Sequence, residues 1–254
     1  SFPLLFPTLT GALDDPEVRA GLTPYVKAAP EWLLPFLNHA IGTSENPDYL
    51  VDTLLKAGPL PDRPEYRDQS NYLLSTLATK GQFSAFQRYY SSLPSVRSNA
   101  LQTPALNKDT INLRYPAAGW QLTENSAIGG AFSEPSKAGA STLSAFAGSG
   151  ERGELMRKLL FLKPGPYRFA AQYDAQSSAP DSEIRWDLLC VSQKGNVSKW
   201  FTSRAVKSGR SGDTQNFTLS ADCPHQLLQL QLAGGSDQLG TEFVLRSVDI
   251  VRAP

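Results

Sequence analysis

Planar polar side chains recur at alternate positions of three segments in the second half of the chain. They are Arg168 and Gln172 in residues 166–173, Arg185 and Asp187 in residues 183–191, and Gln229 and Gln231 in residues 225–232. Alternate residues of a strand point to the same face, so each segment predicts a strand with one polar row. Guanidinium, amide and carboxylate groups hydrogen-bond in a plane, which is the chemistry that an array of sugar hydroxyls requires.

The side chains between these polar residues predict the opposite, buried face. They are Tyr167, Phe169, Ala171 and Tyr173 in the first segment, Ile184, Trp186, Leu188 and Cys190 in the second, and Leu228, Leu230 and Leu232 in the third. If the three segments are neighbours in one sheet, their polar rows form a ligand-binding platform on its outer face, with His225 turned outward beside them. An ordinary solvated sheet face has the same alternation, so both interpretations stay open.

Catalytic motifs are absent from the sequence, which has no nucleophile elbow, phosphate loop, dinucleotide fingerprint or metalloprotease helix. Asp187 and Glu183 fall on one strand face, but Arg185 between them indicates charge balance rather than the acid pair of a glycosidase. His39 lies on a predicted helix with no acid or nucleophile beside it, and His225 opens a predicted strand. We therefore expect both histidines to be structural, and we expect no catalytic residue and no enzyme activity.

The two cysteines, Cys190 and Cys223, fit an exported protein with one disulfide, in a chain that has one methionine and 19 prolines. The bridge would close a loop of about 33 residues and contribute about 3–4 kcal/mol on the chain-entropy model. Two buried thiols that pack as small apolar side chains are the alternative. The cysteines and histidines show no ligand spacing, so the sequence predicts neither a metal site nor a cofactor.

The composition limits the choice of partners. Hydrophobic residues make up 41% of the 254 residues, and 24 lysines and arginines balance 24 aspartates and glutamates. A neutral chain without a long run of one charge gives no reason to expect a nucleic acid, an anionic membrane or another polyanion as partner. Nothing approaches the run of about 18 apolar residues that a membrane span needs, which predicts a soluble chain.

The periodicity of the sequence changes near Thr103. Before this point, start and stop signals predict helices that begin near Asp15, Pro30 and Asn46 and helices over residues 66–80 and 83–90, with Gly42 and Gly58 as stops. After it, short alternating runs predict strands near residues 109–115, 127–133, 140–147, 154–162, 166–173, 183–191, 197–202, 214–219, 225–233 and 241–251. The predicted fold is α+β with segregated elements, namely antiparallel helical hairpins in residues 1–102 and an antiparallel β-sandwich, a jelly roll, in residues 103–254.

Four motifs of the second half resemble the galactose-binding-like jelly rolls found in many carbohydrate-binding modules. They are Gly119-Trp120, GASTL at residues 139–143, LKPGPYRF at 162–169 and EFVLRSVDIV at 242–251. The resemblance implies a sandwich of about 145 residues and makes Trp120 a structural tryptophan. Sugar-binding members stack a pyranose ring on an exposed aromatic side chain, and this implies a stacking role for Trp200 or Phe201. Many members also hold a structural calcium, but no loop here is rich enough in acids to assign one.

The segment YLLSTLATKGQFSAFQRY at residues 72–89 resembles a degenerate tetratricopeptide hairpin. Such hairpins beside a sandwich imply a bacterial periplasmic, cell-envelope or secreted protein. The leading hypothesis is therefore a noncatalytic exported module that binds glycan or another cell-envelope component. The alternatives are a structural or protein-interaction module whose partner surface lies on the helical hairpins, and a glycoside-active enzyme.

Overall fold

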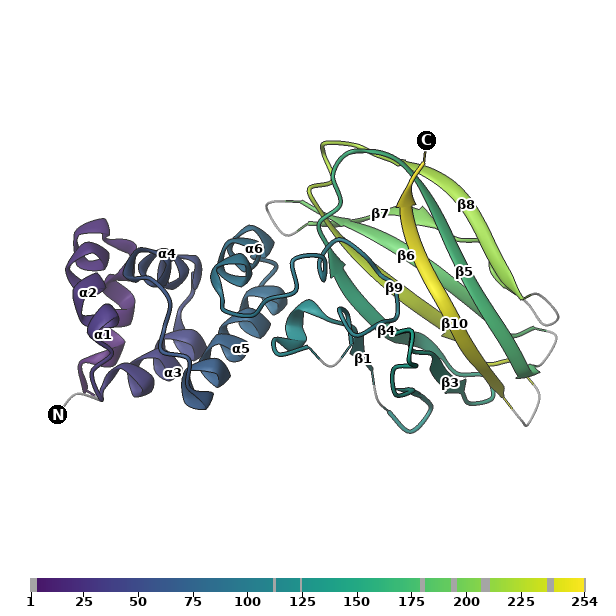
Figure 1. Cartoon of the computed structure of the whole chain (residues 1–254), viewed down its shortest axis with the longest axis horizontal. Coiled ribbons are helices and arrows are strands. Elements are labelled where there is room, and N and C mark those ends of the chain that lie inside the picture. Colours follow the sequence, from purple (N-terminus) through teal and green to yellow (C-terminus); the bar gives the residue numbers. More distant parts are fainter. Residues whose placement is uncertain are drawn as a thin grey trace. The chain divides into compact units, whose positions relative to one another are not determined.

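The computed structural model describes residues 4–111, 113–123, 125–178, 181–192, 196–206, 211–236 and 240–253, with the side chains of residues 175–178 excepted. The chain divides into two compact units, Ser1–Val96 and Arg97–Pro254. The first unit is helical, and the second holds all the described strands (Figure 1). This is the segregated α+β class that the sequence predicts.

The first unit consists of short helices. They are α1 (Phe6–Gly11), the 3-10 turn η2 (Ala12–Asp14), α2 (Pro16–Ala28), α3 (Leu33–Thr43), α4 (Asp48–Ala57), α5 (Pro64–Thr79) and α6 (Phe83–Ser92). The start predicted near Asp15 is confirmed, because its carboxylate accepts the N–H of Glu17 at 2.8 Å and Pro16 occupies the first helical position. Gly81, with φ of 69°, joins α5 to α6, and the tetratricopeptide resemblance of this hairpin stays a prediction. Within the described part of the chain, no helix is both long and apolar enough to cross a lipid bilayer.

Gly42 does not end its helix, contrary to the prediction. α3 continues to Thr43, and the N–H of Ser44 still donates to the carbonyl of Ala40 at 2.9 Å. A Cβ added at position 42 would lie only 2.9 Å from the phenol oxygen of Tyr72. The glycine therefore leaves room for the Tyr72 hydroxyl beside α3, and the helix ends one residue after it.

The second unit is a β-sandwich of two five-stranded sheets. Its strands are β1 (Gln121–Leu122), β2 (Ile128–Phe132), β3 (Leu143–Ala147), β4 (Arg152–Leu160), β5 (Gly165–Ser178), β6 (Glu183–Val191), β7 (Val197–Thr202), β8 (Gly212–Leu219), β9 (His225–Ala233) and β10 (Thr241–Arg252). One sheet has the order β1-β4-β9-β6-β7 and the other β2-β3-β10-β5-β8. Every strand pair in both sheets is antiparallel, as the sequence predicts.

The strand predicted near residues 109–115 is wrong. The N–H groups of Thr110 and Ile111 both donate to the carbonyl of Asn107 at 3.0 Å, which makes this segment a turn. The hydroxyl of Thr110 also bonds within the turn, to Asn107 O at 3.1 Å. Local bonds of this kind offer the backbone an alternative to a sheet ladder, and alternation of apolar residues does not reveal them. The two-residue strand β1 was not predicted.

Trp186 lies fully buried at the centre of the core between the two sheets. Its ring centroid is 5.8 Å from that of Trp120 and 6.0 Å from that of Phe169, and its indole N–H donates to the Tyr173 hydroxyl at 2.5 Å. Every side chain that alternation assigned to the buried face is exposed by 5% or less. The predicted disulfide is confirmed, with the Cα atoms of its two cysteines 5.2 Å apart.

Candidate functional site

Two of the three predicted polar rows lie side by side in one sheet. β6 pairs with β9 so that Arg185 is opposite Gln231 and Asp187 is opposite Gln229. β4 continues the rows on the far side of β9, and β7 continues them beside β6. We call the resulting surface the outer polar face, and its residues are Glu154, Arg157, Arg185, Asp187, Lys199, Thr202, Gln229 and Gln231.

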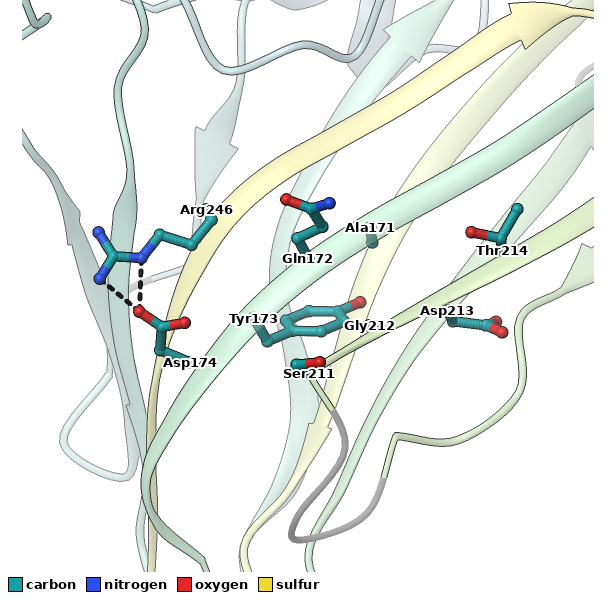
Figure 2. Close-up of a pocket in the computed structure, with 9 residues that line it drawn as sticks. All are labelled: Ala171, Gln172, Tyr173, Asp174, Ser211, Gly212, Asp213, Thr214 and Arg246. Carbon is teal, nitrogen blue, oxygen red and sulfur yellow. Dashed lines mark hydrogen bonds and ion pairs between the residues drawn. The ribbon is translucent and has the colours of Figure 1, made fainter.

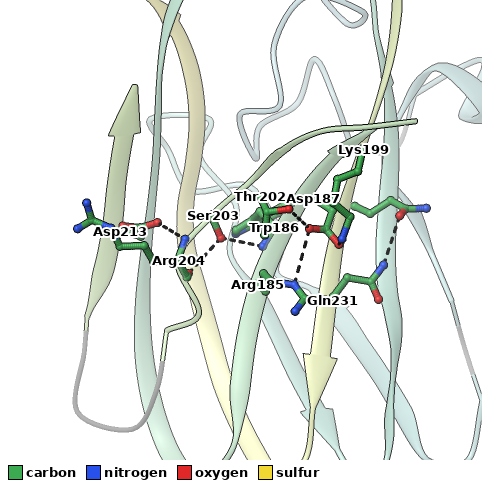
Figure 3. Close-up of polar contacts among 10 residues, drawn as sticks. Arg185, Trp186, Asp187, Lys199, Thr202, Ser203, Arg204, Asp213 and Gln231 are labelled. Atoms are coloured by element: carbon green, nitrogen blue, oxygen red, sulfur yellow. Dashed lines mark hydrogen bonds and ion pairs between the residues drawn. The ribbon is translucent and has the colours of Figure 1, made fainter. Parts of the chain in front are cut away.

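Asp187 organises one half of the outer polar face. Its carboxylate accepts a hydrogen bond from Lys199 Nζ at 3.0 Å and another from the Thr202 hydroxyl at 2.8 Å, and Arg185 Nε lies 3.7 Å away (Figure 3). The Asp187 side chain is only 5% exposed. A buried carboxylate is stabilised only when it is paired. Lys199 and Thr202 of β7 provide its hydrogen bonds, and Arg185 of its own strand adds a longer ionic contact.

Gln229 organises the other half. Its amide Nε2 donates to Glu154 Oε2 at 2.5 Å, and its amide oxygen accepts from Gln231 Nε2 at 3.3 Å. Glu154 also lies 3.7 Å from Arg157 Nε. The hydrogen bond from Gln229 to Glu154 joins β9 to β4, and the other two contacts lie within a strand. Together they orient the amides of Gln229 and Gln231.

The outer polar face passes into an apolar row formed by Leu189 and Leu227, which are opposite each other in β6 and β9 and partly exposed. Beyond that row His225 takes the outward position that alternation predicts, but the residue is buried, with 5% of its surface exposed. The ring of Phe161 packs edge-on against it, with centroids 5.1 Å apart. Burial lowers the pKa of His225 below its ordinary value, since the charged form loses hydration.

The remaining predicted row, Arg168 and Gln172 in residues 166–173, is not part of this surface. β5 belongs to the opposite sheet, between β10 and β8, so Arg168 and Gln172 lie on a different face of the sandwich. The prediction that three strands share one polar face is therefore wrong for β5. Arg168 is aligned there with Asn216 of β8 and Val251 of β10.

Gln172 lines a separate hollow of about 520 Å³ where β8 begins beside β5. The other lining residues are Ala171, Tyr173, Asp174, Ser211, Gly212, Asp213, Thr214 and Arg246. Gly212 is paired with Gln172, and a Cβ at Gly212 would lie 2.7 Å from Ala171 O. In Figure 2, Gln172 and Arg246 lie on one side of the β5 ribbon and Tyr173 on the other, and Arg246 Nε donates to Asp174 Oδ2 at 2.6 Å.

The two predicted stacking residues have different environments. The Trp200 ring is 37% exposed, and its indole N–H donates to Thr218 O of β8 at 2.9 Å. Phe201 is partly buried and stacks on Phe217, with centroids 4.8 Å apart and planes at 25°. Phe201 therefore belongs to the margin of the core, and Trp200 is the more accessible ring at the open edge between β7 and β8.

The chain is similar to solved structures of carbohydrate-binding modules at low sequence identity. No family model matches it, and no curated protein matches it. The xylan-binding domain CBM22-1 of Paenibacillus barcinonensis Xyn10C is 12% identical, with a TM-score of 0.39, and the match covers 61% of this chain and 96% of that one.

Two further solved structures resemble the chain to a similar degree. TmCBM61 in complex with β-1,4-galactotriose is 10% identical, with a TM-score of 0.35 over 53% of this chain and 88% of that one. The enzymatically active domain of tailspike protein 4 from bacteriophage CBA120 is 8% identical, with a TM-score of 0.37 over 52% of this chain and only 19% of that one. At these values the function has to be argued from the site itself.

Half of the outer polar face was not predicted. Glu154 and Arg157 are three residues apart, and β4 brings them to one face only through an irregularity between Glu154 and Met156. β7 has a similar irregularity beside Lys199. Such bulges shift the two-residue period, so strict alternation does not reveal these side chains. Among the described residues, no group of three His, Cys, Asp or Glu side chains is placed to hold a metal ion.

Proposed function

We propose that the sandwich is a noncatalytic glycan-binding module of an exported protein, and that the saccharide lies on the outer polar face. One observation carries the proposal: the buried carboxylate of Asp187 accepts a hydrogen bond from Lys199 and lies 3.7 Å from Arg185 Nε, and Glu154 accepts a hydrogen bond from Gln229. Binding orders polar side chains at a cost in entropy, and that cost falls when the side chains are already held.

The chemistry of the outer polar face suits neighbouring hydroxyl groups. The amides of Gln229 and Gln231 each provide a donor and an acceptor, and Arg185 provides donors in a fixed plane. The partly exposed Leu189 and Leu227 lie next to these groups and can contact the C–H surface of a sugar ring. A pyranose ring has hydroxyl groups beside an apolar C–H surface. The outer polar face is complementary to the hydroxyls, and the adjoining apolar row is complementary to the C–H surface.

The carboxylates of the outer polar face support a noncatalytic role. Asp187 is engaged by Lys199 and Thr202, and Glu154 by Gln229, so both groups are committed to contacts within the protein. A glycosidase needs one carboxyl group to give up a proton to the leaving oxygen and a second to act on the opposite side of the sugar. The disulfide in the same domain supports an oxidising, exported environment.

The test is calorimetric titration of the full chain with oligosaccharides chosen from a glycan array. We expect at least one ligand with a sub-millimolar Kd, and about a tenfold loss of affinity in Arg185→Ala and in Gln231→Ala, since each removes about one hydrogen bond to the ligand. Trp200→Ala weakens binding if the ligand reaches the edge of β7.

Gln172→Ala is the matched control, because this exposed amide lies in the opposite sheet. Its affinity is expected to equal that of the wild type. Loss of binding in Gln172→Ala with full binding in Arg185→Ala would move the site to the hollow beside β8. A glycan array without a single binder would contradict the function itself.

A further inference from the structure

The cations of the outer polar face are more exposed to solvent than its carboxylates. Its cations reach solvent: the side chains of Arg157 and Lys199 are 52% exposed, and that of Arg185 is 40% exposed. Its carboxylates lie beneath them, with Asp187 5% and Glu154 21% exposed. A ligand on this surface therefore meets positive charge first.

The outer polar face also carries a net positive charge. Three cations stand against two carboxylates on the outer polar face. The adjoining row, where Arg152 and Glu183 flank Ala233, adds one charge of each sign and changes nothing. The chain as a whole is neutral, so this local excess is invisible in the composition. Because exposed charges act over about 8–10 Å at moderate salt, the local excess is what a bound ligand experiences.

The two arginines are placed to receive carboxylates. Each uses Nε for its contact inside the protein, Arg185 toward Asp187 and Arg157 toward Glu154, both at 3.7 Å. A guanidinium also has two terminal nitrogens, which form the fork that binds a carboxylate through both oxygens. The arginines lie on β6 and β4, the two neighbours of β9, where Arg185 is opposite Gln231 and Arg157 is opposite Gln229. Two strand spacings and an offset of two residues along β9 put their backbones about 12 Å apart.

We infer that the outer polar face selects acidic glycans, namely oligosaccharides that carry uronate carboxylates. The inference rests on the proposed glycan-binding function and adds the chemical class of the ligand. A linear chain with more than one uronate can place carboxylates on both arginines while its hydroxyls meet the amides of Gln229 and Gln231. Lys199 adds a third positive charge at the β7 side.

The test uses pairs of ligands that differ only in charge. Oligogalacturonate and oligomannuronate are each titrated into the full chain beside their methyl esters, which keep the sugars and the linkages and remove the negative charge. For at least one pair we expect the acid to bind about tenfold tighter than the ester at low salt. The preference should shrink as sodium chloride is raised, because exposed charges are screened.

Three arginine variants locate the effect. Arg185→Gln and Arg157→Gln should each bring the affinity for the acid closer to that for the ester, with little change for the ester. Arg246→Gln is the matched control, since Arg246 is 55% exposed and ion-paired with Asp174 in the opposite sheet. It should leave the preference unchanged.

The outcomes separate this inference from the proposed function. Equal affinity for acid and ester, or tight binding of neutral glycans alone, would overturn the charge preference and leave glycan binding in place. No binding of any glycan would overturn both. A DNA duplex that binds as tightly as the acidic oligosaccharide, or an equal loss in Arg246→Gln, would show unselective attraction of anions and overturn the inference.

Discussion

At the scale of single residues, burial decides what a charge contributes. Asp187 and Asp174 are both aspartates of strands paired with basic side chains, but their surroundings differ. Asp187 is 5% exposed and has Lys199 and Thr202 as hydrogen-bond donors, whereas Asp174 is 51% exposed and paired with Arg246. An exposed pair gains little because water screens it, while an ion that is buried depends on its partners.

We therefore expect Asp187→Asn to lower the free energy of unfolding by about 1–3 kcal/mol, because the buried site loses charge-assisted hydrogen bonds. Asp174→Asn, the matched exposed change, should alter it by less than about 1 kcal/mol. Urea unfolding of both variants at neutral pH measures the difference. Equal losses in the two variants would show that the burial of Asp187 does not increase the contribution of its ion pair to the free energy of unfolding.

Lys158 is the other buried charge-bearing residue with a clear consequence. It is 1% exposed on β4, and its Nζ donates to Ala118 O at 2.7 Å. Burial lowers the pKa of its ammonium group to about 7 from an ordinary 10.5, because the charged form loses hydration. Between about pH 7 and pH 10.5, Lys158 is protonated in the unfolded chain and neutral in the folded chain. Deprotonation therefore favours the folded state, and this contribution to stability grows as pH rises from about 7 to about 10.5.

The variant Lys158→Met should remove this pH dependence. We expect the wild type to gain stability relative to the variant by up to about 1.4 kcal/mol per pH unit between about pH 7 and pH 10.5, with a constant difference below pH 7. Urea unfolding at intervals across this range measures the difference, and exposed Lys163→Met serves as control. Parallel stability curves for wild type and Lys158→Met would contradict a neutral lysine in the core.

At the scale of elements, the alternation of apolar and polar residues predicted well which face of a strand is buried. It did not predict which strands are neighbours in a sheet. It gave the exact bounds of β6, β7 and β9, and in β6 and β9 a buried apolar residue recurs at every second position for most of the strand. It could not assign β5 to a sheet, since pairing depends on contacts between segments far apart in the sequence. His225 alternates outward as predicted, but the packing of Phe161 against it comes from another strand end and has no local signal.

The disulfide is the element-scale feature that the cysteine count predicted directly. It joins the end of β6 to the turn before β9, and its cysteines are 33 positions apart in the sequence. The double variant Cys190→Ala, Cys223→Ala should therefore lose about 3–4 kcal/mol of unfolding free energy, because the unfolded chain regains the freedom of that loop. Urea unfolding with and without dithiothreitol is the measurement. Wild type in reductant should unfold like the variant, and insensitivity to reductant would contradict the bridge.

At the scale of the whole molecule, the chain combines two units with separate cores. The helical unit buries side chains such as Leu33, Phe36 and Phe86, whereas the sandwich buries a continuous cluster around Trp186. The sandwich unit begins at Arg97, a few residues before the change in periodicity at Thr103. The sequence placed the boundary by the onset of alternation, and residues that dock on a sheet without forming a strand carry no alternation.

The position of this boundary can be tested with two fragments, residues 97–254 and residues 103–254. The longer one keeps Leu101, which is 5% exposed and whose carbonyl accepts the N–H of Phe161 at 2.7 Å. Burial of a leucine side chain together with one backbone hydrogen bond stabilises by about 2–4 kcal/mol. We expect both fragments to show a β-rich far-ultraviolet spectrum and the longer one to be more stable by about this amount in urea. Equal stabilities would place the boundary at Thr103, and a disordered longer fragment would mean that the sandwich needs the helical unit to fold.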